Sequence, residues 1–291
     1  RVRRPRADGW QVAAHHRPSV RHFQRSGSSL KPTAASLRYF VQMSIDMSKA
    51  VSSKRAAPSY TFQRIHAALQ TGHALTVQQK REEPVPVFMQ QSVLDASCGT
   101  HMLAMLLVTL GLAKASALHD MSRRKHGVAA AVWTAMSPYY FTGINPKNWT
   151  DEVNSLGLPL ELTARYCIEH DVDAPAVKWL MQGDLVAIAF ASVKHHRTKH
   201  WALAVGVEGL VVGQSHFPQR ILLLDSGGAE PCFHAHNARL RLPDAGPGSR
   251  RAKPGWHKEP KQKMIIWMHE SESWQPEAVR LLAAIRVRRT S

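Results

Sequence analysis

The sequence predicts an α+β fold in which helices come first along the chain and strands follow. Residues 98–181 contain helically spaced apolar positions and Ala-rich stretches, whereas 185–268 contains short, continuous apolar runs separated by Gly, Pro and Asn. Helices followed by strands are typical of α+β domains. The 291 residues are 44% hydrophobic, so a substantial core is expected, and no apolar run reaches the length of a membrane span.

Several segments favour helix. Asp95 or Ser97 can cap a helix that begins at Cys98, because both accept hydrogen bonds from free backbone N–H groups. Pro276 suits the first turn of a closing helix. The helices expected from spacing and composition are 61–70, 98–113, 115–124, 128–136, 151–156, 160–170, 174–181 and 276–286.

Other segments favour strands or loops. Pro84 and Pro86 disfavour helix, so residues 85–89 read as an extended entry segment. The remaining apolar runs are short enough for buried strands, and the Gly- and Pro-rich intervals are expected to be loops. The predicted strands are 185–192, 201–207, 210–212, 221–225 and 264–268, and the predicted loops are 137–148 and 244–260.

Charge and composition divide the chain into three parts. Residues 1–60 are predicted to be a disordered basic tail, and 1–42, with nine basic residues and one acidic residue, to be non-native because Met43 or Met47 can serve as the start. A catalytic domain is expected at 80–270, followed by a C-terminal helix and basic tail at 271–291. The net charge is +17, but no nucleic-acid-reading motif accompanies it, so nucleic acid is not the expected partner.

The chain contains three cysteines, Cys98, Cys167 and Cys232, and this sparse, odd set argues for a reducing compartment. Arg outnumbers Lys and Ala is abundant, as in proteins from GC-rich bacterial genomes. No secretory signal is visible. We therefore expect a bacterial cytoplasmic protein, or one exported as an effector without such a signal.

Cys98 is the first candidate for chemistry, because it lies at a loop-to-helix junction in Asp95-Ala-Ser-Cys-Gly99. A thiolate there is stabilised by free backbone N–H groups and the helix dipole, whereas a buried structural thiol is the alternative. His200 opens an apolar strand and is the candidate base. Asp225 ends another strand and is the candidate that orients the imidazole, with Asn237 as a weaker alternative.

Two glutamines precede the cysteine. Gln91 and Gln90 compete as donors to the oxyanion of a tetrahedral intermediate, together with the Cys98 backbone N–H. Gln91 is the nearer and is preferred, but both remain candidates. A metal site is not expected: Cys232-Phe-His-Ala-His236 and the Cys167–His170 pair lack the paired spacing of zinc motifs. No cofactor-binding pattern is present.

These motifs together resemble a known family. Gln before a Cys-Gly at a helix start, the strand His200-Trp-Ala-Leu-Ala-Val-Gly, and Leu-Leu-Leu-Asp225-Ser-Gly are similar to the papain-like cysteine peptidases, most of all the bacteriocin-processing (double-glycine leader) type and its stand-alone relatives. The resemblance implies a papain-like fold, with the nucleophile helix of an N-terminal helical half packed on an antiparallel sheet. It also implies roles for Cys98 as nucleophile, His200 as base, Asp225 as orienting acid, and Gln91 or Gln90 at the oxyanion.

The sequence departs from that family in the long, largely helical interval between Cys98 and His200, and in Ser226 where Pro is common. We expect a thiol hydrolase that cleaves peptide or isopeptide amides of a peptide or protein substrate. The alternatives are an acyl transferase or deamidase of transglutaminase type on the same triad, and a non-catalytic binding module. The sequence sets no expectation for oligomeric state.

Overall fold

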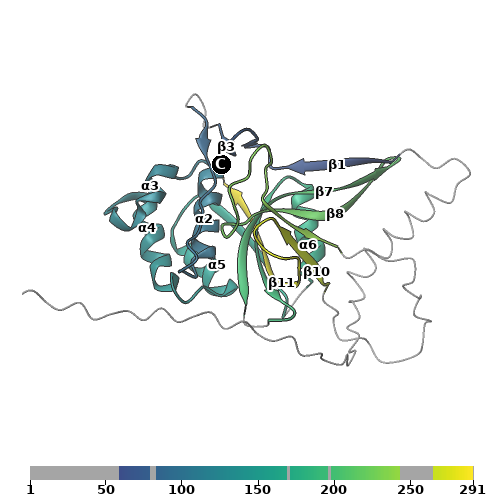
Figure 1. Ribbon diagram of the computed structural model, residues 1–291. Helices are drawn as coiled ribbons and strands as arrows, with labels where there is room; N and C mark the ends of the chain where they lie inside the picture. Colours follow the sequence, from purple (N-terminus) through teal and green to yellow (C-terminus); the bar gives the residue numbers. More distant parts are fainter. Residues whose placement is uncertain (1–58, 79–82, 169–170, 196–197, 243–264, 291) are drawn as a thin grey trace, which may run out of the picture. The chain divides into compact units, whose positions relative to one another are not determined.

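The main sheet closes on itself, as the computed structural model in Figure 1 shows. The structure describes residues 59–78, 83–168, 171–195, 198–242 and 265–290. Six antiparallel strands pair in the order β7-β6-β11-β10-β9-β8, and β8 pairs back to β7. The predicted papain-like α+β fold, a helix layer on an antiparallel sheet, is therefore wrong: the described residues form a closed six-stranded barrel with two added strands and few helices.

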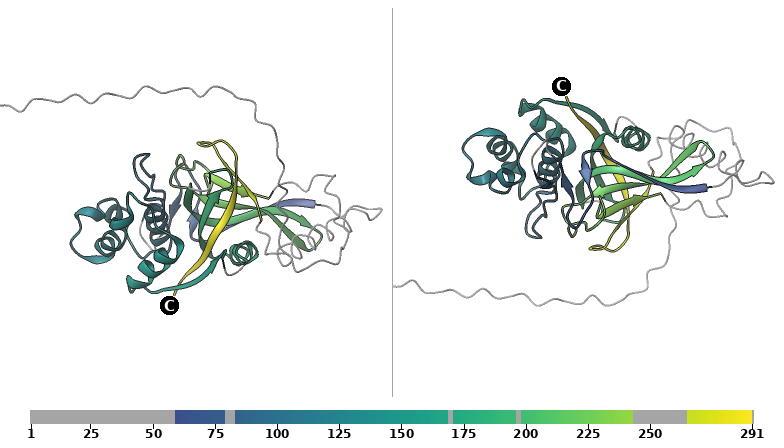
Figure 2. Two further views of the ribbon diagram at one scale, coloured as in Figure 1. Left: turned by 90° about the horizontal axis from the view of Figure 1, so that it is seen from below. Right: turned by 90° about the horizontal axis from the view of Figure 1, so that it is seen from above.

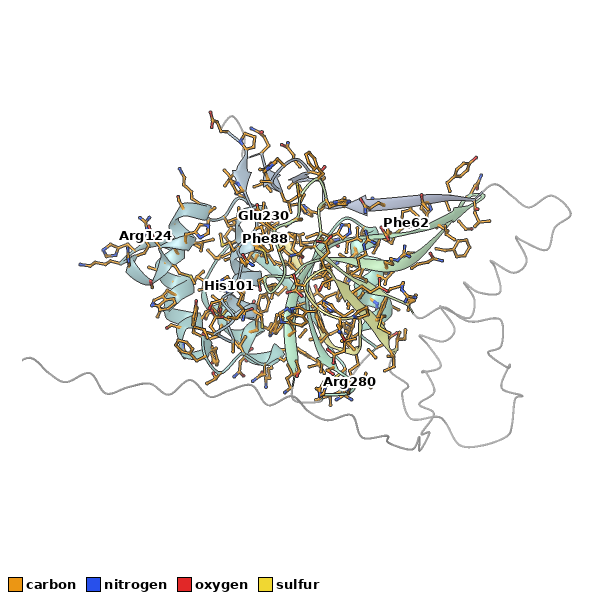
Figure 3. The ribbon with its side chains drawn as sticks, in the orientation of Figure 1. Phe62, Phe88, His101, Arg124, Glu230 and Arg280 are labelled. Atoms are coloured by element: carbon orange, nitrogen blue, oxygen red, sulfur yellow. The ribbon has the colours of Figure 1, made fainter. Side chains whose placement is uncertain are left out.

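The barrel strands differ greatly in length. They are β6 (Leu185–Ser192), β7 (Lys199–Val212), β8 (Ser215–Leu224), β9 (Ala238–Arg241), β10 (Trp267–Ser271) and β11 (Glu277–Arg289). The two added strands are β1 (Ser59–Ile65), which pairs with β7, and β5 (Leu160–Tyr166), which pairs with β11. Because β7 and β11 each pair with several neighbours, they are the strands that link the barrel to its extensions. Phe62 of β1 marks one extension, on the side away from the helices of residues 98–155 (Figure 3).

The helices α2 to α5 gather on one side of the barrel (Figures 1 and 2). They are α2 (Cys98–Thr109), α3 (Ala115–His119), α4 (Gly127–Met136) and α5 (Pro146–Ser155), with two 3-10 turns, η1 (Met121–Arg123) and η2 (Ser137–Tyr139). A further helix, α6 (Asp173–Met181), leads into β6. A small sheet of β2 (Leu69–Gln70), β3 (Thr76–Val77) and β4 (Val85–Pro86) precedes α2.

Two apolar clusters lie on opposite faces of the barrel wall. The inner cluster draws residues from all six barrel strands, among them Phe190, Ala202 and Trp267, and includes the apolar side of α6. The outer cluster joins α2 to alternate residues of four of these strands, β6, β7, β8 and β11, including Trp201 and Leu203. β6 is buried along its whole length because its two faces serve the two clusters, which explains its continuous apolar sequence.

Three predicted helices are strands. Residues 61–70 lie in β1 and β2, 160–170 contains β5, and the closing helix at 276–286 is β11. Each segment contains residues with good helix propensity, but pairing with distant strands outweighs that local preference. β11 pairs with β6, β10 and β5, so its backbone hydrogen bonds are satisfied across the sheet.

Other element predictions hold with changed boundaries. Helices at 98–113, 115–124, 128–136 and 174–181 are confirmed in large part, and 185–192 is β6. The strands predicted at 201–207 and 210–212 form one strand, β7, and 264–268 overlaps β10. Helix α5 begins within the predicted loop 137–148, where Asn145 accepts from the Asn148 N–H as an N-cap. The predicted loop 244–260 and nearly all of the predicted tail 1–60 lie outside the described residues.

Candidate active site

His200 and Asp225 form a buried pair at one end of the barrel. His200 Nε2 lies 2.6 Å from Asp225 Oδ1, and the two residues are 7% and 2% exposed. His200 is the second residue of β7, and Asp225 directly follows β8. Because these strands are antiparallel neighbours, the start of one meets the end of the other.

Helix α2 brings the thiol to this pair. Cys98 is the first residue of α2 and is 7% exposed; its Sγ contacts Ala96 O at 4.0 Å, and it interacts electrostatically with His200, whose pKa it helps to raise. Since the Nε2 atom of His200 faces Asp225, the Nδ1 atom is the one left for the sulfur. The structure therefore brings together Cys98, His200 and Asp225, which are distant in the sequence.

The charges of this group support one another. Burial alone lowers the pKa of His200, but the Asp225 carboxylate and hydrogen bonds to Asp225 and Cys98 outweigh it and raise the pKa to about 10. For Asp225, burial favours the neutral acid, yet the imidazolium charge and its hydrogen bonds hold the carboxyl pKa well below its usual range. The arrangement stabilises a charged imidazolium between a carboxylate and a sulfur.

Gln91 fastens the segment before α2 to the end of β8. Its backbone N–H donates to Ser226 O at 2.8 Å, and its side-chain Oε1 accepts from the Ser226 hydroxyl at 3.3 Å. Its Nε2 donates to Asp95 O at 2.8 Å, and its side chain also interacts with the Asp95 carboxyl group. Gln90 is exposed and makes no hydrogen bond with the described residues. Of the two, Gln91 is thus the one built into the site.

A short hydrogen-bonded cluster fixes the start of α2. Ser97 occupies the N-cap position, but its hydroxyl contacts the Asp95 carboxylate and lies 2.9 Å from His101 Nδ1, so it does not cap the helix N–H groups. Asp95 also accepts from the Ser97 N–H at 3.0 Å. Neither residue therefore caps α2 with its side chain as predicted, and the Asp95 turn instead sets the direction of the chain entering Cys98.

Asn237 supports Asp225 through the main chain. Its Oδ1 accepts from the Asp225 N–H and its Nδ2 donates to the Asp225 carbonyl, both at 2.7 Å. A second bond from Nδ2 reaches Ala229 O at 2.8 Å. Asn237 does not orient the imidazole, because its side-chain amide bonds to the Asp225 backbone and to Ala229 in the following loop.

Aromatic side chains enclose the imidazole. Trp274, from the loop between β10 and β11, lies 5.1 Å from the His200 ring, centroid to centroid, and Phe190 lies 5.4 Å from it. A Cβ added at Gly227 would stand 3.2 Å from the Trp274 ring and 3.3 Å from Asp225 Oδ1. A side chain at position 227 would therefore crowd the indole that covers the imidazole–carboxylate bond.

The reason for glycine after the nucleophile is packing. A Cβ at Gly99 would lie 2.8 Å from Ile144 Cγ2 and 3.3 Å from Trp201 Cδ1. The Gly99 carbonyl also accepts from the Trp149 indole at 3.1 Å, and the Trp149 and Trp201 rings lie 5.3 Å apart. These contacts hold α2 close to β7 and leave no space for a substrate backbone on that side.

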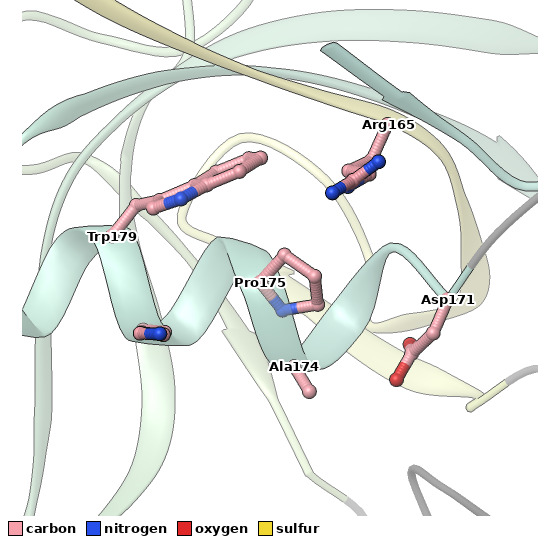
Figure 4. Close-up of a pocket in the computed structure, with 6 residues that line it drawn as sticks. Arg165, Asp171, Ala174, Pro175 and Trp179 are labelled. Carbon is pink, nitrogen blue, oxygen red and sulfur yellow. The ribbon is translucent and has the colours of Figure 1, made fainter. Parts of the chain in front are cut away.

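The remaining candidate ligands do not form a cluster. His236 Nε2 accepts from Arg239 at 2.9 Å, Cys232 is exposed, and His170 lies outside the described residues. No group of three metal-ligating side chains occurs in the described ranges. A hollow of about 580 Å³ beside α6, lined partly by Arg165, Lys178 and Trp179, shares no residue with the Cys98 group (Figure 4).

No family model and no curated protein matches this chain. The chemistry of the site is therefore inferred from its geometry. None of the helices that the structure describes combines the length and apolar character needed to cross a bilayer.

Two residues of the site have no place in the sequence motifs. Trp274 lies in a polar loop, and His269 lies in β10, where its Nε2 is 3.4 Å from Asp225 Oδ2. The one signal that could have found His269 is the alternation of β10, which turns His269 to the same face as the buried Trp267.

Proposed function

We propose that this protein is a cysteine hydrolase that cleaves peptide or isopeptide amide bonds through an acyl-enzyme. The supporting observation is the convergence of Cys98, His200 and Asp225 in one buried group, with the imidazole bonded to the carboxylate at 2.6 Å. A nucleophile, a base and a group that orients the base are the parts that covalent acyl transfer requires. The buried setting strengthens each charge interaction among them.

The chemistry follows from the contacts. Cys98 gives its proton to His200, and the thiolate attacks the amide carbonyl to form a tetrahedral oxyanion. His200 then donates that proton to the departing nitrogen, so the C–N bond breaks, an amine leaves and a thioester remains. Water, deprotonated by His200, attacks the thioester and the C–S bond breaks. The acid is then released, and the Cys98 thiolate is left beside His200, which carries the proton taken from that water. Asp225 keeps its negative charge throughout and holds the ring in place.

The oxyanion needs donors close to the sulfur. Cys98 begins α2, where the first backbone N–H groups of a helix have no partner within the helix. Gln91 lies beside this helix start, and its side-chain amide, which donates to Asp95 in the structure, would turn toward the oxyanion. These two donors are proposed to bind the oxyanion.

The test begins with thiol reactivity. The chain has three free cysteines, so Cys167→Ala and Cys232→Ala are matched controls for Cys98→Ala. We expect iodoacetamide to label Cys98 rapidly at about pH 6.5, well below the titration of a free thiol near pH 8.5. Labelling of Cys98 only near pH 8.5 would favour a binding module with an inert thiol.

Turnover is tested with a panel of peptide amides carrying electrophilic or fluorogenic leaving groups. Cys98→Ala should abolish cleavage and leave the circular dichroism spectrum unchanged, while the Cys167 and Cys232 variants should keep it. Mass analysis of the products in the presence of an added amine then separates hydrolysis from acyl transfer. An acyl group joined to the added amine shows that the amine, and not water, is the acceptor. Cleavage by the Cys98→Ala chain would contradict the proposal.

A further inference from the structure

Asp225 lies between two imidazoles. Oδ1 accepts from His200 Nε2 at 2.6 Å and from the Gly227 N–H at 2.8 Å. The nearest polar contact of Oδ2 within the described residues is a 3.4 Å ion-pair contact with His269 Nε2, a buried atom that makes no hydrogen bond with the described residues and faces this oxygen. The two carboxylate oxygens are thus assigned to different histidines, one on β7 and one on β10.

This placement follows from the alternation of the barrel strands. Inward positions along β6, β7 and β10 are apolar through most of the barrel. At one end they are the aromatic ring of Phe190 and the imidazoles of His200 and His269. Asp225 continues the inward series of β8, after Ile221 and Leu223. The end of the inner core therefore consists of polar and aromatic side chains.

His269 is buried and packed by rings. It is 1% exposed, with ring centroids 5.2 Å from Phe190 and 5.6 Å from Trp274. The titratable groups that face this region are Asp225, His200 and Glu277, which is the β11 residue opposite His269. Glu277 is engaged by the Ser192 hydroxyl, which leaves the Asp225 carboxylate as the acceptor nearest to His269 Nε2.

We infer that His269 is a positioning residue, which holds the Asp225 carboxylate so that Oδ1 stays directed at His200. This rests on the proposed function for its catalytic consequence. A carboxylate can rotate about its last side-chain bond, and a buried oxygen without a donor is unfavourable. A donor on Oδ2 removes both problems, and it fixes the plane in which Oδ1 meets the His200 ring. His269 acts on His200 only through Asp225.

Substitutions at position 269 can distinguish the effect of the donor nitrogen from the effect of ring packing. His269→Gln places an amide nitrogen near the position of Nε2 and keeps the donor, whereas His269→Phe keeps a ring against Phe190 and Trp274 and removes it. His269→Asn carries an amide too short to reach Oδ2. His216→Phe, at an exposed histidine on β8 that packs edge-on against Phe62, is a matched control.

The kinetic readout uses the full chain and the best peptide amide of the panel. We expect kcat to fall about tenfold in His269→Phe and His269→Asn, because both variants remove the polar group that faces the Asp225 carboxylate, with KM unchanged. His269→Gln should retain most of the rate, and His216→Phe all of it. Equal rates in the Phe, Asn and Gln variants would overturn the inference, whether all are high or all are low.

A second readout does not need turnover. In the Cys98→Ala chain, proton NMR with 15N-labelled histidine should show the His200 Nε2 proton far downfield, since it lies in a short bond to a carboxylate. His269→Phe and His269→Asn should broaden this signal by faster exchange with water, and His269→Gln should preserve it. A signal that is present and unchanged in all variants overturns the role of His269 and leaves the proposed function standing. Absence of the signal in the parent chain contradicts the His200–Asp225 pair on which the proposed function depends.

Discussion

Asp225→Asn tests the electrostatic part of the site. The substitution keeps an oxygen that can accept from His200 and from the Gly227 N–H, and it removes the negative charge 2.6 Å from the imidazole. The Asn237 bonds go to the Asp225 main chain, so they are retained. The variant therefore changes charge with little change in packing.

The magnitude follows from the state of His200. Burial lowers its pKa, but the charge and hydrogen bond of Asp225 outweigh burial and raise the pKa to about 10. Without that charge, His200 returns to its unperturbed pKa of about 6.5 or below. At about pH 7.5 the protonated fraction of His200 then falls from nearly one to about one in eleven, so the positive charge that favours a thiolate at Cys98 is mostly lost. We expect alkylation of Cys98 to slow about tenfold.

The assay is the rate of iodoacetamide labelling of Cys98 at about pH 7.5, in a chain that lacks Cys167 and Cys232. Asp184→Asn, which removes a carboxylate that pairs with Arg288 2.7 Å away, is the control and should leave the rate unchanged. An Asp225→Asn rate equal to that of the parent would refute the claim that the carboxylate charge activates the pair.

Three other substitutions test the fold and the setting of the site. Gly209→Ala should destabilise the chain by about 1–3 kcal/mol in urea unfolding, because the new Cβ would clash with Phe217 O across the β7–β8 pairing, whereas Gly72→Ala, where there is room, should be neutral. Trp274→Ala should slow Cys98 alkylation several-fold by admitting water to the imidazole–carboxylate bond, and Trp274→Phe should not; equal rates would exclude a shielding role. Burial raises the pKa of Asp173 to about 7, so the folded state binds that proton more tightly than the unfolded state and stability falls as pH rises from about 4 to about 7. Asp173→Asn should remove this fall and stabilise the chain by on the order of 3 kcal/mol at about pH 8, and a pH slope parallel to that of the parent would contradict it.

β11 shows why the barrel could not be predicted from the sequence. Glu277–Arg289 contains Leu, Ala and Arg, which favour helix, and its alternation is broken by a bulge between Leu281 and Ala283. The inward residues are odd-numbered before the bulge, as at Val279, and even-numbered after it, as at Ala284. An alternating pattern that changes phase within one strand is hard to recognise in the sequence. The pairing that decides the structure of this segment also comes from strands far away in the chain.

The site was easier to predict, because its parts lie at the ends of elements. A cysteine at a helix start, a histidine at a strand start and an aspartate at a strand end are visible locally, and the structure brings these three together. His269 has no such signal of its own. A single histidine within a short strand becomes informative only when the partner it faces is known.

The register of β7 connects the two halves of the site. Trp201 points to the outer face, where it packs against Gly99 at the start of α2, and its neighbour His200 points to the inner end of the barrel. A slip of one residue would exchange these two side chains, so the docking of the thiol helix and the base would be lost together. Register shifts in the β7–β8 pairing, between Ala204 and Gly206 and between Glu208 and Gly209, make any other alignment of this strand unfavourable. The distance from sulfur to imidazole is therefore set by the pairing of the whole strand, and residues far along β7 contribute to it.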